Sequence, residues 1–197
     1  MVQCLHRGEI MSSSALTKKE LGHALKELMN LMPMNKITVA MVCEKCDLNR
    51  QTFYYHFQDI YECLGYIYQS EVIEKLPEFD SLEQWPDHFL KILKYIEQNK
   101  VFCLNTFNSL GRDHLEMFLS ETSFAMVENG IRQFAHDVNI DPDRLNFIVN
   151  FYAIAFSGLI IQWLTRGCRD SSEELAATLS TMLQGSFTNA IDNLRNQ

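Results

Sequence analysis

The residues best suited to binding another molecule lie in one short stretch, Asn49 to Asp59, which reads NRQTFYYHFQD. Asn, Arg, Gln and Thr side chains can bond base edges or phosphates. On a helix, Phe53 and Phe57 lie four residues apart and face inward. The same helix places Arg50, Gln51 and the two tyrosines on its other side. The stretch therefore predicts a polar reading surface supported by an aromatic inner stripe.

The elements around this stretch resemble a DNA-binding module in their order and length. A capping box at Thr17 and Glu20 opens a long helix, which Pro33 ends. Thr38 caps a short second helix, and Asp47 provides a turn residue that tolerates the left-handed conformation. Asn49 then caps a third helix. A long helix, a short helix, a tight turn and a second short helix predict a helix-turn-helix whose last helix enters the major groove.

The rest of the chain also predicts helices. Glycine and proline total 12 of 197 residues, and no stretch alternates apolar and polar residues as a strand would. The fold class expected is all-α, with residues 1–16 as a flexible N-terminal extension, 17–62 as the DNA-binding domain and 63–197 as a helical dimerisation and effector-binding domain. Helices after the first domain are expected from Asp59, from Ser81 to Asn99, over 101–110, over 112–138, from Asp141 to Arg166 and from Ser171 to Leu194.

The charge is divided unevenly between these parts. Residues 1–60 carry 7 Lys and Arg against 6 Asp and Glu, whereas residues 61–197 carry 10 against 19. The N-terminal part, here called the head, is therefore near-neutral, and the rest of the chain, the body, is acidic. This division is compatible with a compact nucleic-acid module. The six scattered cysteines and the lack of an apolar leader favour a reduced, cytoplasmic protein. The longest apolar run, 151–164, is too short to span a bilayer, so no membrane segment is expected.

The segment KITVAMVCEKCDLNRQTFYYHFQDIYECL resembles the signature of TetR-family transcriptional regulators. The segment NRQTFYYHFQDIY, together with FYAIAFSGLIIQWLTRG near the C-terminus, is similar to sequences of the subgroup typified by regulators of dihydroxyacetone kinase operons. Two positions depart from the family pattern. Cys46-Asp47 stands where Ala-Gly is usual, and Ile60 replaces a lysine that often contacts phosphate.

The resemblance implies roles that side-chain chemistry also supports. Arg50 can bond guanine in bidentate fashion or a phosphate, and Gln51 can bond a base edge. Thr38 can offer its hydroxyl to a phosphate, and Tyr54 and His56 resemble residues that position the DNA backbone. Two further residues stay open: Tyr55 could equally pack on the first helix, and Thr52 could bond its own backbone. The candidate DNA-binding residues are Thr38, Asn49, Arg50, Gln51, Thr52, Tyr54, Tyr55 and His56.

The cysteines could bind a metal or act as nucleophiles, or they could be buried core residues. Cys43 and Cys46 have the spacing of half a zinc site, but no second pair completes four ligands. Cys103 could pair with His88 or His114 as a nucleophile, yet it lies at apolar spacing and lacks an oxyanion-forming loop. We therefore expect no enzyme activity, no metal and no cofactor.

The body offers a candidate pocket and a candidate interface. Aromatic side chains could line an effector cavity, although aromatics at helical spacing can equally be core; the candidates are Phe102, Phe107, Phe118 and Tyr152. The helix over 142–166 carries two apolar stripes, one of them comprising Ile148, Tyr152, Ala155 and Leu159. The other stripe predicts a four-helix homodimer interface at Ile154, Gly158 and Ile161, with Ala153 and Ser157 allowing close approach. The alternative is a central helix in a monomer.

Together these patterns predict a homodimeric, sequence-specific regulator of transcription that reads palindromic double-stranded DNA and answers a small-molecule or protein signal. The alternative is a helical protein-interaction co-regulator with little DNA binding of its own.

Overall fold

The computed structural model describes residues 13–72, 74, 84–134 and 141–195. The expected cap at Ser81 and the end of the helix expected over 112–138 fall outside these residues.

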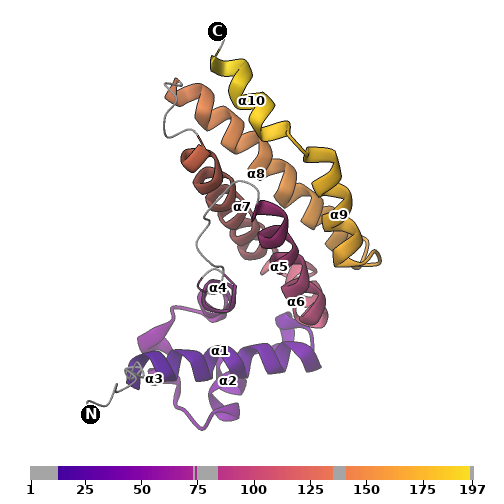
Figure 1. The fold of residues 1–197 in the computed structure, drawn as a ribbon. Coiled ribbons are helices and arrows are strands. Elements are labelled where there is room, and N and C mark those ends of the chain that lie inside the picture. The colour runs from indigo at the N-terminus through magenta and orange to yellow at the C-terminus, as the bar shows by residue number, and fades with distance from the viewer. Residues whose placement is uncertain (1–12, 73, 75–83, 135–140, 196–197) are drawn as a thin grey trace, which may run out of the picture.

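The described residues form helices, with no strand among them, which confirms the all-α prediction (Figure 1). The reading head comprises α1 (Ser13–Leu31), the short 3-10 helix η1 (Met34–Lys36), α2 (Val39–Lys45) and α3 (Arg50–His56). The body comprises α4 (Ile60–Glu71), α5 (Trp85–Gln98), α6 (Lys100–Phe107), α7 (Arg112–Phe134), α8 (Pro142–Thr165), α9 (Ser172–Leu183) and α10 (Ser186–Arg195). In Figure 1 the head lies at the lower end, α4 is seen end-on above it, and the longer helices of the body rise away from it.

Several helix starts follow from capping residues of the sequence. Thr38 accepts a hydrogen bond from the Met41 amide at 3.3 Å, and Asp59 accepts two from the first turn of α4. Asp141 and Ser171 cap α8 and α9 in the same way. Each cap satisfies backbone N–H groups that have no partner inside their own helix, which fixes where the helix begins.

Several predicted boundaries were wrong, among them the end of the helix expected over 101–110, which lies at Phe107. α1 begins at Ser13, so Thr17 is not its cap; the Thr17 hydroxyl instead donates to the Ser13 carbonyl inside the helix at 3.0 Å. The last helix is also not continuous, because Gly185 has a φ of 72° and separates α9 from α10. A left-handed residue cannot continue a right-handed helix, and glycine adopts that conformation without the clash of a Cβ atom.

Two aromatic clusters fill the body and contain three of the four aromatic side chains predicted to line a pocket. The Tyr68 ring stacks on Phe118 at 4.8 Å and contacts Phe102 at 5.3 Å. Tyr152 packs on Phe187 at 4.2 Å and donates to or accepts from the Ser186 hydroxyl at 2.6 Å. The fourth, Phe107, lies beneath the Arg112 guanidinium at 4.3 Å and is also buried. All four side chains predicted to line a pocket are therefore buried and make packing contacts with other side chains.

α8 has one face in the core and one outside it. Its buried residues include Ile148, Tyr152, Phe156 and Ile160, whereas Phe147, Phe151 and Ile154 are 73, 59 and 68% exposed. Ala153 and Ser157 are buried in the body and Ala155 is exposed, which reverses the faces expected for these three residues. α8 is long and apolar enough to meet the length and composition of a membrane span, with 44% of its most apolar window buried. The buried inner face of α8 therefore accounts for only part of its apolar surface, and the rest is exposed.

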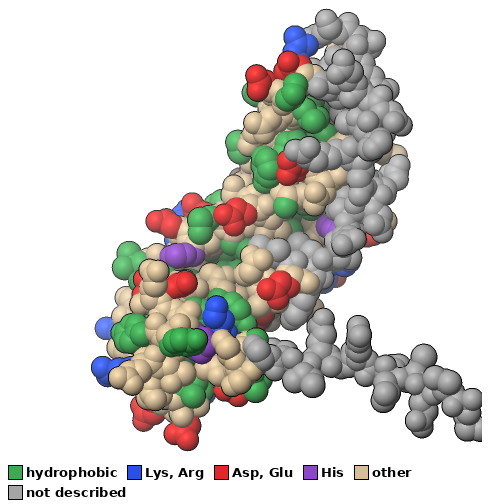
Figure 2. Space-filling view, turned by 90° about the vertical axis from the view of Figure 1, so that its left-hand side faces the viewer, with side chains coloured by type: hydrophobic (Ala, Val, Ile, Leu, Met, Phe, Trp, Pro, Cys, Tyr) green, Lys and Arg blue, Asp and Glu red, His purple; other side chains and the backbone are tan. Residues whose placement is uncertain are grey.

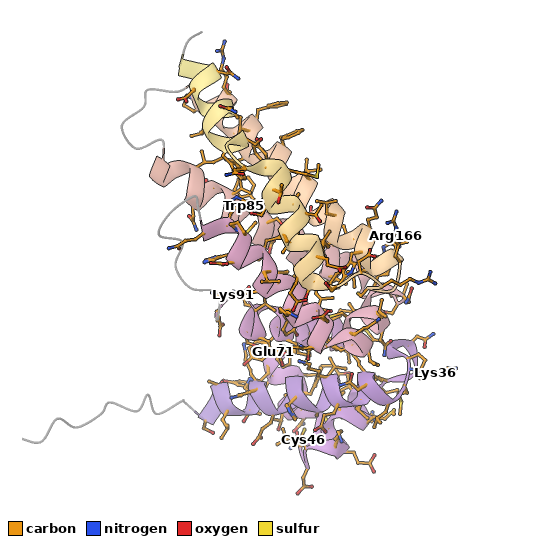
Figure 3. The ribbon with its side chains drawn as sticks, turned by 45° about the vertical axis from the view of Figure 1, so that its right-hand side comes forward. Lys36, Cys46, Glu71, Trp85, Lys91 and Arg166 are labelled. Carbon is orange, nitrogen blue, oxygen red and sulfur yellow. The ribbon has the colours of Figure 1, made fainter. Side chains whose placement is uncertain are left out.

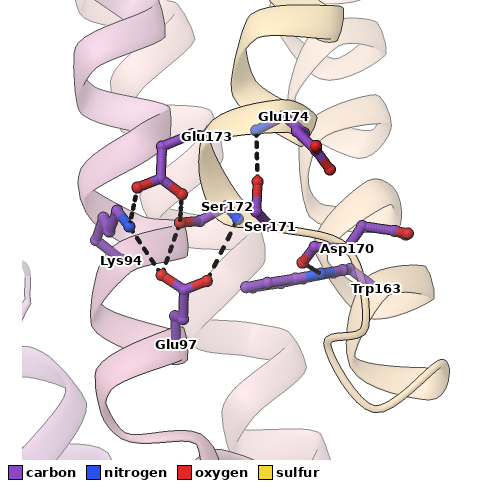
Figure 4. A network of polar contacts seen from close by, with 8 residues as sticks. All are labelled: Lys94, Glu97, Trp163, Asp170, Ser171, Ser172, Glu173 and Glu174. Atoms are coloured by element: carbon purple, nitrogen blue, oxygen red, sulfur yellow. Dashed lines mark hydrogen bonds and ion pairs between the residues drawn. The ribbon is translucent and has the colours of Figure 1, made fainter.

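A polar network holds α9 against α5 (Figure 4). Lys94 forms ion pairs with Glu97 at 2.9 Å and with Glu173. The Ser172 hydroxyl donates to Glu97 at 2.9 Å, and the Ser172 amide donates to the same carboxylate at 3.4 Å. The network thus connects the first turn of α9 to the last turns of α5.

Candidate nucleic-acid interface

The turn between α2 and α3 sets the angle at which α3 leaves the head. Asp47 has a φ of 53°, as its place in the turn predicted, and its amide donates to the Glu44 carbonyl at 3.3 Å. The Leu48 amide returns to the Cys43 carbonyl at 2.9 Å. These bonds finish α2 and direct the chain into α3 through a turn of four residues, 46–49.

The inner face of α3 is anchored in the core. Phe53 and Phe57 are buried with ring centroids 5.7 Å apart, and Leu48 packs beside them half-buried. Phe57 also contacts the Tyr66 ring of α4 at 5.5 Å, with the Lys18 ammonium above it. The predicted inner stripe is confirmed, and its burial fixes the rotation of α3 about its own axis.

The outer face of α3 is open to solvent over the residues predicted to read DNA. Arg50, Gln51 and Tyr54 are exposed, and Tyr55 is 81% exposed, so its ring does not pack on α1. His56 is half-buried and contacts the edge of the Tyr55 ring at 4.9 Å. Figure 2 shows hydrophobic, basic and histidine side chains gathered over the head, interspersed with acidic ones.

Three candidate residues also hold the local structure. The Asn49 side-chain oxygen accepts from the Thr52 amide at 2.8 Å and from the Thr52 hydroxyl at 3.0 Å. The exposed Thr38 has its hydroxyl oxygen engaged as the cap of α2. These residues order the starts of α2 and α3, and the hydroxyls of both threonines lie at the surface of the head.

The lysines of the head differ in their availability. Lys36 is exposed, whereas Lys45 is paired with Glu27 at 2.8 Å; this hydrogen bond and charge lower the pKa of Glu27. Lys26 faces the body and pairs with Glu71. The basic character of the head therefore depends on fewer residues than the sequence indicates.

The cysteines behave as core residues. Burial raises the pKa of Cys43 and of Cys46, and the Cys46 thiol donates to the Val42 carbonyl at 3.1 Å. Cys103 is completely buried, and that burial raises its pKa to about 12, which keeps it in the protonated, non-nucleophilic form. His88, one of the two histidines considered as a partner of Cys103, is buried on α5. Within the part of the chain that the structure describes, no three metal-ligating side chains form a group that could hold an ion.

The contacts that fix the orientation of the head relative to the body were not predicted from the sequence. They involve Asn105 of α6, which bonds the end of α1, and His114 of α7, which stacks on Tyr61 at 5.7 Å. Their partners lie tens of residues away along the chain, so no local pattern marks them.

A helical body that carries a head with this helix-turn-helix is the architecture typical of helix-turn-helix transcriptional regulators. Comparison with known proteins agrees. The model of the TetR-type transcriptional regulator C-terminal region matches residues 83–185, more than half of the chain. The chain belongs to the TetR family of transcriptional regulators, which is a family of regulators and not of enzymes.

Individual relatives cover nearly the whole chain. The HTH-type dhaKLM operon transcriptional activator DhaS of Lactococcus lactis subsp. lactis (strain IL1403) is 29% identical over 179 residues, which are 88% of this chain and 91% of that protein. The solved structure of a dihydroxyacetone kinase operon activator DhaS has a TM-score of 0.69 at 21% identity and covers 91% of this chain and 98% of its own. NalD of Pseudomonas aeruginosa, described as the secondary repressor of the MexAB-OprM multidrug efflux pump, has a TM-score of 0.59 at 14% identity, with the same two coverages. The two structures show a shared fold.

Proposed function

We propose that the protein is a cytoplasmic, homodimeric regulator that binds a palindromic operator through α3 and responds to a signal at its C-terminal domain. The observation that carries the proposal is the division of α3 into a buried aromatic face and an exposed face with Arg50, Gln51, Tyr54 and Tyr55. A fixed inner face with free guanidinium, amide and phenol groups outside is suited to the major groove.

The exposed apolar face of α8 supports the dimer. Phe147, Phe151 and Ile154 project from it, and Gly158 is exposed with open space where a Cβ atom would lie. Ile161 is half-buried beside them. A contiguous apolar face of this kind is costly in water and is satisfied by the same face of a second copy across a two-fold axis. Two heads in one dimer would then meet half-sites about 34–36 Å apart.

The signal is proposed to reach the head through the body. Phe102 and Phe118 pack on Tyr68 of α4, the helix that joins the two parts, so a ligand or partner that displaces these rings would move α4. An effector pocket at Phe102, Phe107, Phe118 and Tyr152 therefore requires some of these packed side chains to rearrange.

DNA binding itself tests the proposal. Because the L. lactis relative is named an activator of a dhaKLM operon, the probes are the DNA upstream of the chain's own gene and upstream of a dihydroxyacetone kinase operon. We expect a gel shift with one of these, displaced by unlabelled palindrome and not by scrambled DNA. Absence of any specific shift at micromolar dimer would favour the co-regulator alternative.

A further inference from the structure

One side chain of the body completes a helix of the head. The Asn105 amide nitrogen, on α6, donates to the Met29 carbonyl at 2.6 Å and to the Met32 carbonyl at 2.8 Å. Its side-chain oxygen accepts from the Met34 amide at 2.9 Å. Met29 and Met32 lie at the C-terminal end of α1, where carbonyls lose their partners within the helix.

Asparagine is the side chain that fits this position. The two carbonyls require two donors and the Met34 amide requires one acceptor, so the orientation of the Asn105 amide is fixed by its partners. Aspartate would keep the acceptor and place a carboxylate against two carbonyl oxygens. Alanine would leave all three backbone groups of this half-buried site without their partner.

Close packing surrounds the same point. A Cβ atom at Gly111, just after α6, would lie 2.8 Å from a methyl carbon of Leu64 and 3.1 Å from the Met34 sulfur. The Ser109 hydroxyl donates to the Thr106 carbonyl at 2.8 Å and lies 3.5 Å from the Met34 sulfur. α6 and the turn after it therefore contact η1 directly, and only Ile37 and Thr38 separate η1 from α2.

A second contact joins head and body through α4. Lys26 of α1 forms an ion pair with Glu71 at the end of α4, and Glu71 also accepts from the Tyr95 hydroxyl of α5 at 2.9 Å. The Lys26 ammonium lies over the Tyr95 and Phe102 rings at 5.2 and 5.3 Å. Glu71 lies where the upper helices meet the layer of α1 (Figure 3). α1 is thus held at its end by α6 and farther along by α4 and α5.

We propose that Asn105 is the positioning residue that locks the head to α6, so that α6 and the end of α1 move as one body. Because α2 packs on α1 and α3 packs on α2, a displacement of the end of α1 with α6 is carried to the reading helix. This role rests on the proposed function, since it concerns how two heads in a dimer are held at one separation on DNA.

The test is the tolerance of DNA binding to half-site spacing. Wild-type dimer is assayed on palindromes whose half-sites are moved apart or together by one and two base pairs, and is compared with Asn105→Ala and Asn105→Asp. A loosened joint lets each head find its half-site independently. In the Asn105 variants we expect the ratio of affinities for the best spacing and its neighbours to fall by about fivefold or more. A change of this size corresponds to the net contribution of one or more hydrogen bonds. Asn108→Ala is the matched control, because the Asn108 amide bonds only the Leu104 carbonyl of its own helix.

A second measurement does not depend on DNA. Hydrogen exchange at the Met34 amide should accelerate by about fivefold or more in Asn105→Ala, with smaller change in Asn105→Asp, which keeps the acceptor. Uniformly weaker binding at every spacing, with selectivity unchanged, would overturn the positioning role, as would unchanged exchange at Met34. A wild-type protein that binds none of the palindromes overturns the proposed function instead, and the exchange rates then show whether the contact itself exists.

Discussion

Asn49 and Thr52 are bonded to each other twice at the start of α3, through the Thr52 amide at 2.8 Å and the Thr52 hydroxyl at 3.0 Å. The residue pair therefore acts first as a helix cap. Because the pair adjoins Arg50, a change to it can alter the order of α3 or, where it introduces a charge, the charge beside Arg50.

Replacement of Asn49 separates these two effects. Asn49→Ala removes the cap and should lower the free energy of unfolding by about 1 kcal/mol, measured by urea denaturation. Asn49→Asp keeps a capping oxygen and should retain stability, but its negative charge next to phosphates should weaken DNA binding. Equal loss of stability in both variants would contradict the capping role.

Arg50 is tested by removing its guanidinium and by replacing it with an ammonium. Arg50→Ala should cost about 1–3 kcal/mol of specific DNA binding with little change in thermal stability, because the side chain is exposed. Arg50→Lys distinguishes the two kinds of contact. A phosphate contact would survive with a similar salt dependence, whereas a bidentate base contact would be lost with its sequence preference. Operator affinity equal to wild type in both variants would exclude Arg50 from the interface.

Asp47 occupies a left-handed conformation that glycine adopts more easily. Asp47→Gly should therefore be neutral or slightly stabilising, whereas Asp47→Val should destabilise the head by about 1–2 kcal/mol. Thermal melting of both variants measures the difference. A valine variant as stable as wild type would show that the turn relaxes to another conformation.

A charge on the outer face of α8 should separate the proposed dimer. Ile154→Glu places an unpaired carboxylate against its symmetry mate and should cost several kcal/mol of association, on the order of 3–5. Sedimentation at micromolar concentration measures it, with Gln98→Glu on the exposed surface of α5 as a control for charge alone. The variant should also lose operator binding. A monomeric wild type that binds a palindrome tightly would contradict the interface.

The network between α5 and α9 predicts acid sensitivity. The hydrogen bond and charge of Lys94 lower the pKa of Glu97 and lower that of Glu173 to about 2. Carboxyls whose pKa falls on folding contribute stability above their unfolded value of 4.5, and this contribution is lost as the pH falls from about 4.5 toward about 2. Lys94→Met should therefore flatten the fall of melting temperature between about pH 6 and pH 3. Lys91→Met, exposed on the same helix, should leave the profile as in wild type.

The features that the sequence predicted depend on neighbours within a few residues. Asn49, Thr38 and Ser171 cap helices because their side chains reach an amide two or three positions ahead. The buried face of α3 follows from the spacing of Phe53 and Phe57 alone. Gly185 carried a usable signal, a glycine just after an apolar helical stripe, that the prediction of one last helix overlooked.

The features that the sequence missed depend on distant partners. The bonds of Asn105 span 71 to 76 residues, and no periodicity links it to α1. Ala153 and Ser157 were placed on the wrong side of α8 because a helix that is apolar all round gives no polar face to set its rotation. That rotation is set by packing in the body, where Phe156 contacts Phe89 of α5 and Phe187 of α10.

Asn105 also makes the head and body less separable than their order in the chain implies. A chimera that joined this head to another regulator's body after α4 would keep every residue of the recognition motif but lose the cap of its first helix. The exchangeable unit is therefore discontinuous: it comprises residues 13–72 together with the short segment around α6 that finishes α1. Grafting this DNA specificity onto a new sensor requires both pieces to be transplanted together.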